Sequence, residues 1–294
     1  MSDNTINRRT AIASIAGGAV AATVGNTSIA SAAKANLKGR IKQSVSRWCY
    51  GGVVEDFDSF AKQCAEMGLV GIDLISDPKQ WDICQKYGLV ATMVSGASSI
   101  GNGLNDKKFH KDQMDAFKKN IPAAAKYNWP NVICFSGSRA GKTDYEAWDN
   151  CSKILKEAVK IAEDNDITIC MELLNSKVDH RDYQCDKTLW GVELCKRVGS
   201  PRFKLLYDIY HMQIMEGDVI RVLRDNIDYI GHFHTGGNPG RKDLDKSQEL
   251  YYPAIMDAIA ELQEKGKFNG YVAHEFVPKH GMQSLKDAVL LCDV

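Results

Sequence analysis

The sequence has 294 residues, of which 44% are hydrophobic and 25% are charged. This composition is typical of a globular protein with one large domain or two small ones. Lysine and arginine together number 37, and aspartate and glutamate also number 37. Because there is no basic surplus, the composition argues against a broad nucleic-acid-binding surface and favours a site for a small molecule.

The first 32 residues have the pattern of a twin-arginine export signal. The segment Asn7-Arg8-Arg9-Thr10 precedes a run rich in Ala, Gly and Val over 11–24, and Ala30-Ser31-Ala32 matches a small-residue cleavage site. The run is interrupted by glycines and is short for a membrane span, which needs ~20 apolar residues. We therefore expect a cleaved signal over 1–32, a mature domain over 33–294, a periplasmic location and no membrane anchor. The alternative is an unstructured tail with a chance arginine pair, which would leave the protein in the cytoplasm.

The remaining sequence alternates between strand-like and helix-like segments. Short runs rich in Val, Ile and Phe predict strands over 44–50, 71–76, 90–95, 131–136, 168–174, 203–210, 229–235 and 271–276. Longer segments with helical periodicity predict helices over 57–67, 78–87, 106–127, 144–163, 189–198, 218–226, 251–265 and 283–291. Eight strand-then-helix units, with no other regular element, predict a single-domain α/β fold with a parallel sheet.

Eight such units in about 250 residues fit a closed (β/α)8 TIM barrel. Asp56 and Asp77 are suited to cap helices, and glycines suited to a left-handed helix end follow four of them, at Gly68, Gly88, Gly199 and Gly266. The alternative is an open doubly wound sheet, which normally has a glycine-rich phosphate loop after its first strand. No GxGxxG motif follows the segment 44–50. The nine cysteines form no CxxC pair; we expect most to be buried, and their spacing predicts no disulfide.

Charged side chains concentrate at the ends of the last four predicted strands. The first four strands offer the less charged Trp48, Tyr50, Asp73, Ser95 and Ser136. The last four deliver Glu172, Asp208, His234 and Glu275. In a TIM barrel these ends meet at one face, where active sites lie. Because buried carboxylates are costly unless paired or metal-bound, we predict that these four residues bind one divalent cation. Each could instead be a rim residue paired with Lys or Arg.

The donor set indicates which cations fit. Three carboxylates and one imidazole favour Mn²⁺, Mg²⁺ or Co²⁺ over a structural zinc ion. His232 and His234 point to the same face of a regular strand, and His234 is chosen as ligand because it lies nearer the carboxyl end. His232 is predicted to be a supporting or core residue. His274 should face the helices and have a structural role.

Four sequence motifs carry a family resemblance. They are Met171-Glu-Leu-Leu-Asn175, Tyr207-Asp-Ile-Tyr-His-Met-Gln213, Gly231-His-Phe-His234 with Asn238-Pro-Gly-Arg241, and His274-Glu-Phe-Val-Pro278. With these motifs the mature chain resembles the hydroxypyruvate isomerase branch of the xylose-isomerase-like sugar isomerase and epimerase superfamily. The resemblance implies that Glu172, Asp208, His234 and Glu275 are the metal ligands. It also implies that His211 and Arg241 contact the oxygens of the substrate.

The resemblance predicts an isomerase that moves a proton between adjacent carbons of a small 2-hydroxy aldehyde or ketone. Glu172 and Glu275 are expected to be the catalytic acid and base, while the cation stabilises the negative charge of the enediolate. A histidine at position 234 is more similar to ketose 3-epimerases, so an epimerase or dehydratase is a second hypothesis. A non-catalytic periplasmic sugar-binding barrel is a third. The expected partner is a small hydroxy-carbonyl or sugar substrate; the sequence gives no signal for oligomeric state.

Overall fold

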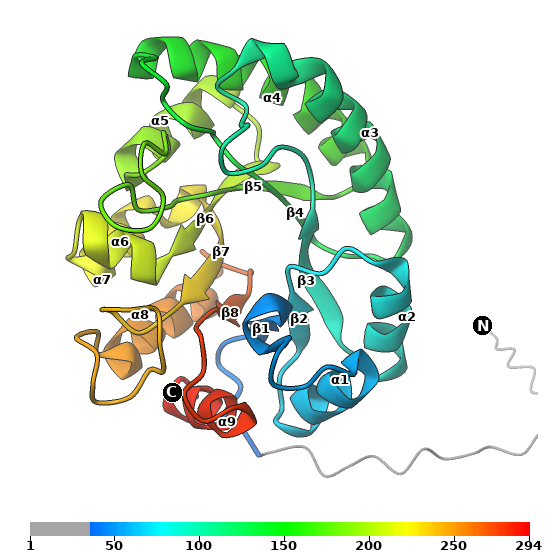
Figure 1. Cartoon of the computed structure of the whole chain (residues 1–294), viewed down its shortest axis with the longest axis vertical. Coiled ribbons are helices and arrows are strands. Elements are labelled where there is room, and N and C mark those ends of the chain that lie inside the picture. The colour runs from blue at the N-terminus through cyan, green and yellow to red at the C-terminus, as the bar shows by residue number, and fades with distance from the viewer. Residues whose placement is uncertain (1–35) are drawn as a thin grey trace, which may run out of the picture. The chain divides into compact units, whose positions relative to one another are not determined.

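The computed structural model describes residues 36–294, and these residues form a parallel β-barrel surrounded by helices (Figure 1). The predicted export signal, residues 1–32, lies outside the described residues and stays a prediction. The strands are β1 (Gln43–Ser46), β2 (Gly71–Asp73), β3 (Val90–Ser95), β4 (Asn131–Cys134), β5 (Thr168–Glu172), β6 (Phe203–Asp208), β7 (Ile230–Thr235) and β8 (Val272–His274). Each strand pairs in parallel with the next, and β8 pairs with β1, so the sheet closes. The predicted TIM barrel is therefore confirmed, and the open sheet is excluded.

Helices follow the strands in the order that the sequence predicts. They are α1 (Phe57–Glu66), α2 (Pro78–Lys86), α3 (His110–Lys126), α4 (Asp144–Asp164), α5 (Thr188–Val198), α6 (Ile209–Met215), α7 (Val219–Asn226), α8 (Tyr252–Glu264) and α9 (Met282–Leu291). Asp56 caps α1 by accepting from the Ser59 amide at 2.8 Å, and Asp77 caps α2 by accepting from the Lys79 amide at 3.0 Å. Gly199 ends α5 with a φ of 74°, which glycine adopts without steric cost.

Two segments differ from the sequence-based prediction. The first strand ends at Ser46, and Arg47–Tyr50 form a short 3-10 helix, so Trp48 lies beyond the strand. The prediction that 203–210 is all strand, with no regular element before 218, is wrong because α6 begins at Ile209. The Asp208 carboxylate accepts a hydrogen bond from the His211 amide at 3.2 Å, which caps this helix immediately after β6. The apolar pattern of Ile209 and Tyr210 suits a continued strand, but these residues form the first turn of α6.

Hydrophobic side chains pack against both faces of the closed sheet. The interior holds a separate buried cluster of Met93, Ile133, Cys170 and Leu206. Cys170 and Leu206 each lie two residues before a predicted ligand, so Glu172 and Asp208 share the inward face with them. All nine cysteines are buried and unpaired. Among the described residues, none of the helices has the length and apolarity that a membrane span requires.

His274 faces outward between the sheet and α9, as predicted. Its ring is fully buried, with Nε2 2.9 Å from Gln43 Oε1 and Nδ1 3.1 Å from Thr235 Oγ1. Gln43 in turn donates to the carbonyl of Val289 on α9. Burial lowers the pKa of His274 to about 3. The side chain is therefore neutral in the folded protein at pH values where an exposed histidine is charged.

This histidine predicts a loss of stability in mild acid. As the pH falls from about 6.5 to 3, the unfolded chain binds a proton that folded His274 does not, so unfolding becomes more favourable by up to about 1.4 kcal/mol per pH unit. The free energy of unfolding of metal-free protein is measured by denaturant titration at pH 6.5 and at pH 5. The difference between the two pH values should be smaller in His274→Gln than in wild type, by about 1.6 kcal/mol. The matched control is His280→Gln, which changes an exposed histidine and should keep the wild-type difference. Equal pH differences in wild type and His274→Gln would contradict the prediction.

Candidate metal centre

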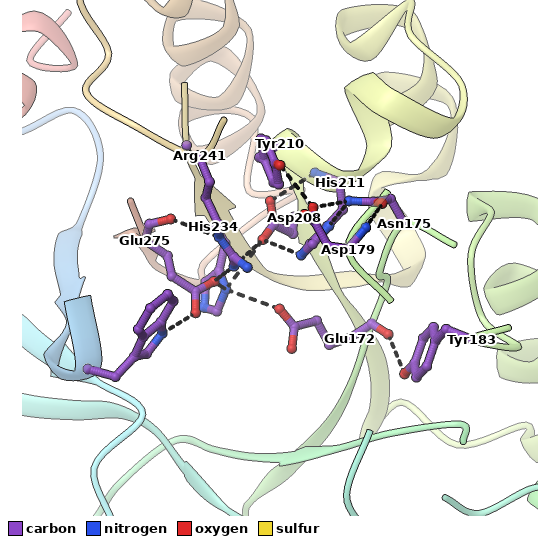
Figure 2. A network of polar contacts seen from close by, with 12 residues as sticks. Glu172, Asn175, Asp179, Tyr183, Asp208, Tyr210, His211, His234, Arg241 and Glu275 are labelled. Carbon is purple, nitrogen blue, oxygen red and sulfur yellow. Dashed lines mark hydrogen bonds and ion pairs between the residues drawn. The ribbon is translucent and has the colours of Figure 1, made fainter. Parts of the chain in front are cut away.

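Four consecutive strands bring the predicted ligands together. Glu172 and Asp208 are the last residues of β5 and β6, His234 lies one residue before the end of β7, and Glu275 directly follows β8. All four are buried, and one donor atom of each lies within 4.8 Å of the others. His234 Nδ1 is the common neighbour, at 2.5 Å from Glu275 Oε2, 3.5 Å from Glu172 Oε1 and 4.0 Å from Asp208 Oδ2. In Figure 2, His234 is seen between the two glutamates.

The three buried carboxylates differ in pKa. Burial raises the pKa of Asp208 to about 7; the charge of Arg241 lowers it, and that of Glu275 adds to the increase. Burial also raises the pKa of Glu172, which a hydrogen bond from His234 only partly offsets. Burial acts in the same direction on Glu275, but the charges of Arg241 and His234 are stronger and hold its pKa well below the usual range. Glu275 is thus held ionised, while Glu172 binds a proton more readily.

The residues present fit a hard divalent cation. Three carboxylates and one imidazole nitrogen provide oxygen-rich coordination, and their repulsion at this spacing is what a divalent cation would relieve. The pKa of His234 also fits this reading. Burial lowers that pKa, but the charge of Glu275 and hydrogen bonds with Asp73, Glu172 and Glu275 raise it well above the usual value. In the metal-free protein, protons therefore supply part of the positive charge that the site requires.

Arg241 and Trp48 donate hydrogen bonds to different oxygens of the Glu275 carboxylate. Arg241 Nη2 donates to Glu275 Oε2 at 2.5 Å and to Asp208 Oδ2 at 3.1 Å. The Trp48 indole donates to Glu275 Oε1 at 2.6 Å. Arg241 also lies 5.5 Å from the ring centres of both Trp48 and Tyr210. The guanidinium therefore pairs with two of the predicted ligands and lies close to two aromatic rings.

His211 is placed by a network on the opposite side of the site (Figure 2). The carbonyl oxygen of the Asn175 side chain accepts from the amides of Val178 and Asp179 at 3.0 and 2.9 Å. This fixes the orientation of the side-chain amide, whose nitrogen donates to His211 Nδ1 at 2.6 Å and to Asp179 Oδ2 at 2.7 Å. Because Nδ1 accepts, the proton of a neutral ring must lie on Nε2.

The free edge of His211 faces the predicted ligands. Its Nε2 lies 3.6 Å from Asp208 Oδ2 and has no hydrogen-bond partner within residues 36–294. Burial, followed by the charge of Arg241, lowers the pKa of His211 well below its usual value, so the ring is neutral. A buried N–H without a partner is costly, which makes this atom available to a ligand oxygen.

The structure thus brings all six predicted site residues into one cluster. Three further residues, Trp48, Asp73 and Asn175, belong to it although the sequence assigned them no role. Asp73 is at the end of β2, and its Oδ2 lies 2.8 Å from His234 Nε2. Their polar character at strand ends was visible in the sequence. Their partners were not, since Asp73 and His234 are 161 positions apart.

Comparison with known proteins gives matches to sugar and hydroxy-acid isomerases. The chain is 32% identical over 124 residues to a 2-oxo-tetronate isomerase of Cupriavidus necator, covering 42% of this chain and 45% of that protein. It is 26% identical over 170 residues to the hydroxypyruvate isomerase of Escherichia coli, covering 56% and 64%. A D-psicose 3-epimerase of Ruminiclostridium cellulolyticum is 29% identical over 175 residues, covering 58% and 55%. The matched segments span roughly half the length of these relatives.

The family-level match is more extensive than these alignments. The model of the xylose isomerase-like TIM barrel family matches residues 54–290, a range that begins before α1, ends within α9 and includes all of the predicted ligands. The closed barrel and the clustering of polar residues at the ends of β5 to β8 agree with that match. The chain therefore belongs to the xylose isomerase-like TIM barrel family.

Proposed function

We propose that this protein is a divalent-metal-dependent isomerase of a short 2-hydroxy aldehyde or ketone, of the hydroxypyruvate type. The observation that carries the proposal is the convergence of Glu172, Asp208, His234 and Glu275 within 4.8 Å. The named activities of the 2-oxo-tetronate and hydroxypyruvate isomerases to which the chain is similar support the same substrate class. The isomerisation of hydroxypyruvate and that of 2-oxo-tetronate both require a proton to move between adjacent carbons.

The pKa values of the two glutamates suggest how the proton moves. Glu275, held ionised by Arg241 and His234, is the group to accept the proton from the substrate carbon. Glu172, whose pKa burial raises, is the group to return a proton to the neighbouring carbon. Two carboxyl groups whose environments push their pKa values apart are the usual arrangement for acid and base. The cation, when bound, supplies Lewis-acid stabilisation of the negative charge that develops on the substrate oxygens.

His211 and Arg241 are proposed to hold the substrate between these carboxylates. The Nε2–H group of His211 donates to a substrate oxygen, because Asn175 has already engaged Nδ1. Arg241 donates through Nη2 to the two acids and through Nε to the Glu275 carbonyl. Its third nitrogen, Nη1, suits a substrate carboxylate or hydroxyl. Trp48, half exposed beside Arg241 and Glu275, lies next to the same space.

The proposal is tested by metal analysis combined with NMR detection of deuterium incorporation. The purified protein is loaded with Mn²⁺, Mg²⁺ or Co²⁺ and incubated in D2O with hydroxypyruvate, short hydroxy-aldehydes and ketoses; Mn²⁺ and Co²⁺ are removed by chelation before spectra are recorded. Metal-dependent exchange with aldehyde–ketone interconversion supports the isomerase. A metal-bound protein that exchanges no substrate proton would instead be a binding protein, and a protein that binds none of the three cations overturns the proposal.

A ketose 3-epimerase is the second candidate. The imidazole in the ligand set favours it, as does the 29% identity to D-psicose 3-epimerase over 175 residues. In the same experiment, exchange at C3 of a ketose with inversion there, and without formation of an aldose, identifies this activity. The proton-transfer roles of Glu172 and Glu275 are unchanged in that case.

The Asn175–His211 contact predicts the effect of a single-atom change. In Asn175→Asp, one carboxylate oxygen can still accept from the Val178 and Asp179 amides, but the other now requires a proton on His211 Nδ1. In a neutral ring, Nε2 then has no hydrogen and cannot donate to the substrate. We expect kcat/KM to fall about 10–100-fold, the loss for a donor worth about 1–3 kcal/mol.

The matched control is Asn128→Asp, which adds the same charge at an exposed position before β4. It should leave kcat/KM within about twofold, as surface substitutions usually do. Long-range ¹⁵N–¹H NMR of the His211 ring reports the tautomer directly. A normal kcat/KM with an inverted tautomer would show that Nε2–H does not contact the substrate.

A further inference from the structure

Asp73 is a buried carboxylate that the proposed reaction does not use. It lies at the end of β2, whereas its partner His234 is on β7, and these strands are not neighbours in the barrel. The contact therefore crosses the barrel interior. Both side chains are fully buried, so the pair is removed from solvent and its geometry is set by the sheet.

Asp73 lies next to three groups that are able to donate hydrogen bonds. Its Oδ2 lies 2.8 Å from His234 Nε2. Its Oδ1 accepts from the Thr92 hydroxyl at 2.6 Å and lies 3.3 Å from His232 Nε2. An ionised carboxylate can only accept hydrogen bonds, so His234 must keep a hydrogen on Nε2. A neutral ring then has its lone pair on Nδ1, the atom that faces Glu172, Asp208 and Glu275.

We propose that Asp73 is the positioning residue that selects Nδ1 of His234 as the cation ligand and fixes the ring plane. This inference rests on the proposed metal site. A hydrogen bond from the second nitrogen of a liganding histidine to a carboxylate fixes its tautomer and orientation, and losing such a partner typically weakens metal binding 10–100-fold. The same contact explains why β2 contributes a charged residue although the ligands come from β5 to β8.

A competing arrangement is that Asp73, His232 and His234 hold a cation themselves, since their donor atoms also lie within 4.8 Å of one another. Asp73 is already engaged by Thr92, whose hydroxyl oxygen lies 3.1 Å from that of Ser44. That triad also has only one carboxylate, against three in the other group. The two arrangements differ in which nitrogen of His234 carries a hydrogen, so an experiment can separate them.

The first experiment measures Mn²⁺ affinity by competition with a chelator in wild type, Asp73→Ala and Asp73→Asn. We expect a 10–100-fold weaker affinity in the alanine variant. The asparagine variant should lose less, because its amide oxygen can still accept from Nε2. Thr92→Val is the control: it removes the hydroxyl on the far side of Asp73 and should change affinity less than about threefold. Circular dichroism of the metal-free proteins checks folding.

The second experiment needs no substitution. Long-range ¹⁵N–¹H NMR of wild-type protein loaded with diamagnetic Zn²⁺ should show His234 with a protonated Nε2 and a metal-bound Nδ1. The opposite assignment overturns the proposal, as does loss of Mn²⁺ binding in Asp73→Ala while Asp208→Asn retains it. Equal affinity in wild type and Asp73→Ala removes the role of Asp73 alone. A wild-type protein that binds no cation removes the proposed function as well.

Discussion

Replacing Glu275 by glutamine is expected to lower kcat about 10²–10⁴-fold, the contribution of a positioned acid or base. Glutamine has nearly the same shape, and its amide oxygen can still accept from Arg241 or Trp48. It cannot accept the substrate proton, because an amide is not a base at neutral pH. The measurement is the rate at which the substrate α-proton exchanges with D2O in the presence of saturating Mn²⁺, followed by NMR after removal of the metal.

Two controls separate lost chemistry from lost metal. The Mn²⁺ content of Glu275→Gln is measured alongside its rate, since the residue is also a proposed ligand. Glu264→Gln makes the same change in an exposed residue that pairs with Arg40, and it should keep the wild-type rate. If Glu275→Gln exchanges the α-proton as fast as the wild type, Glu275 is not the base.

Replacing Asp208 by asparagine is expected to weaken Mn²⁺ binding by more than about 100-fold. Loss of a residue that only supports a ligand already costs about 10–100-fold, and Asp208 is proposed to bind directly. The side-chain oxygen of asparagine can still accept a hydrogen bond from the backbone amide of His211, so α6 should remain capped. Affinity measured by chelator competition and helix content measured by circular dichroism test these two statements separately.

The same carboxylate predicts how metal binding depends on pH. The pKa of Asp208 is raised to about 7 in the metal-free protein, so protons compete with the cation as the pH falls through 7. Apparent Mn²⁺ affinity should therefore decrease steadily from pH 8 to pH 6. An affinity that is constant over this range, or that increases as the pH falls, would rule out Asp208 as a ligand that must lose a proton.

The sequence was sufficient to predict the barrel and to name the four polar residues that the structure brings together at the ends of β5 to β8. The alternation of strand and helix patterns predicts all eight strands, and a closed barrel requires their carboxyl ends to meet. Glu172, Asp208 and Glu275 end apolar runs, where a carboxylate is difficult to explain as packing. The choice of His234 over His232 followed from its position nearer the strand end, and the structure places only His234 among the three acids.

The parts that were missed depend on contacts between distant segments. Nothing near Asp73 in the sequence indicates His234, because the pairing arises from two non-neighbouring strands that point into one interior. Helix α6 was missed because Ile209 and Tyr210 suit a strand as well as a helix. The cap provided by Asp208 decides between them. Strand ends were also predicted too long, since an apolar run does not show where pairing stops.

The double engagement of Asp208 has a consequence for altering the range of substrates. One of its oxygens caps the helix that carries His211, and the other faces Arg241 and the other proposed ligands. Substitutions at the junction of β6 and α6 are therefore expected to disturb the helix start, the proposed substrate donor and the proposed cation site together. The segment from Asn175 to Tyr183 touches the site through Asn175 and Asp179 and contributes none of the four ligands. Directed evolution toward longer or differently charged substrates should thus be most productive at 176–178 and 180–182 of that loop, with Asn175 and Asp179 retained.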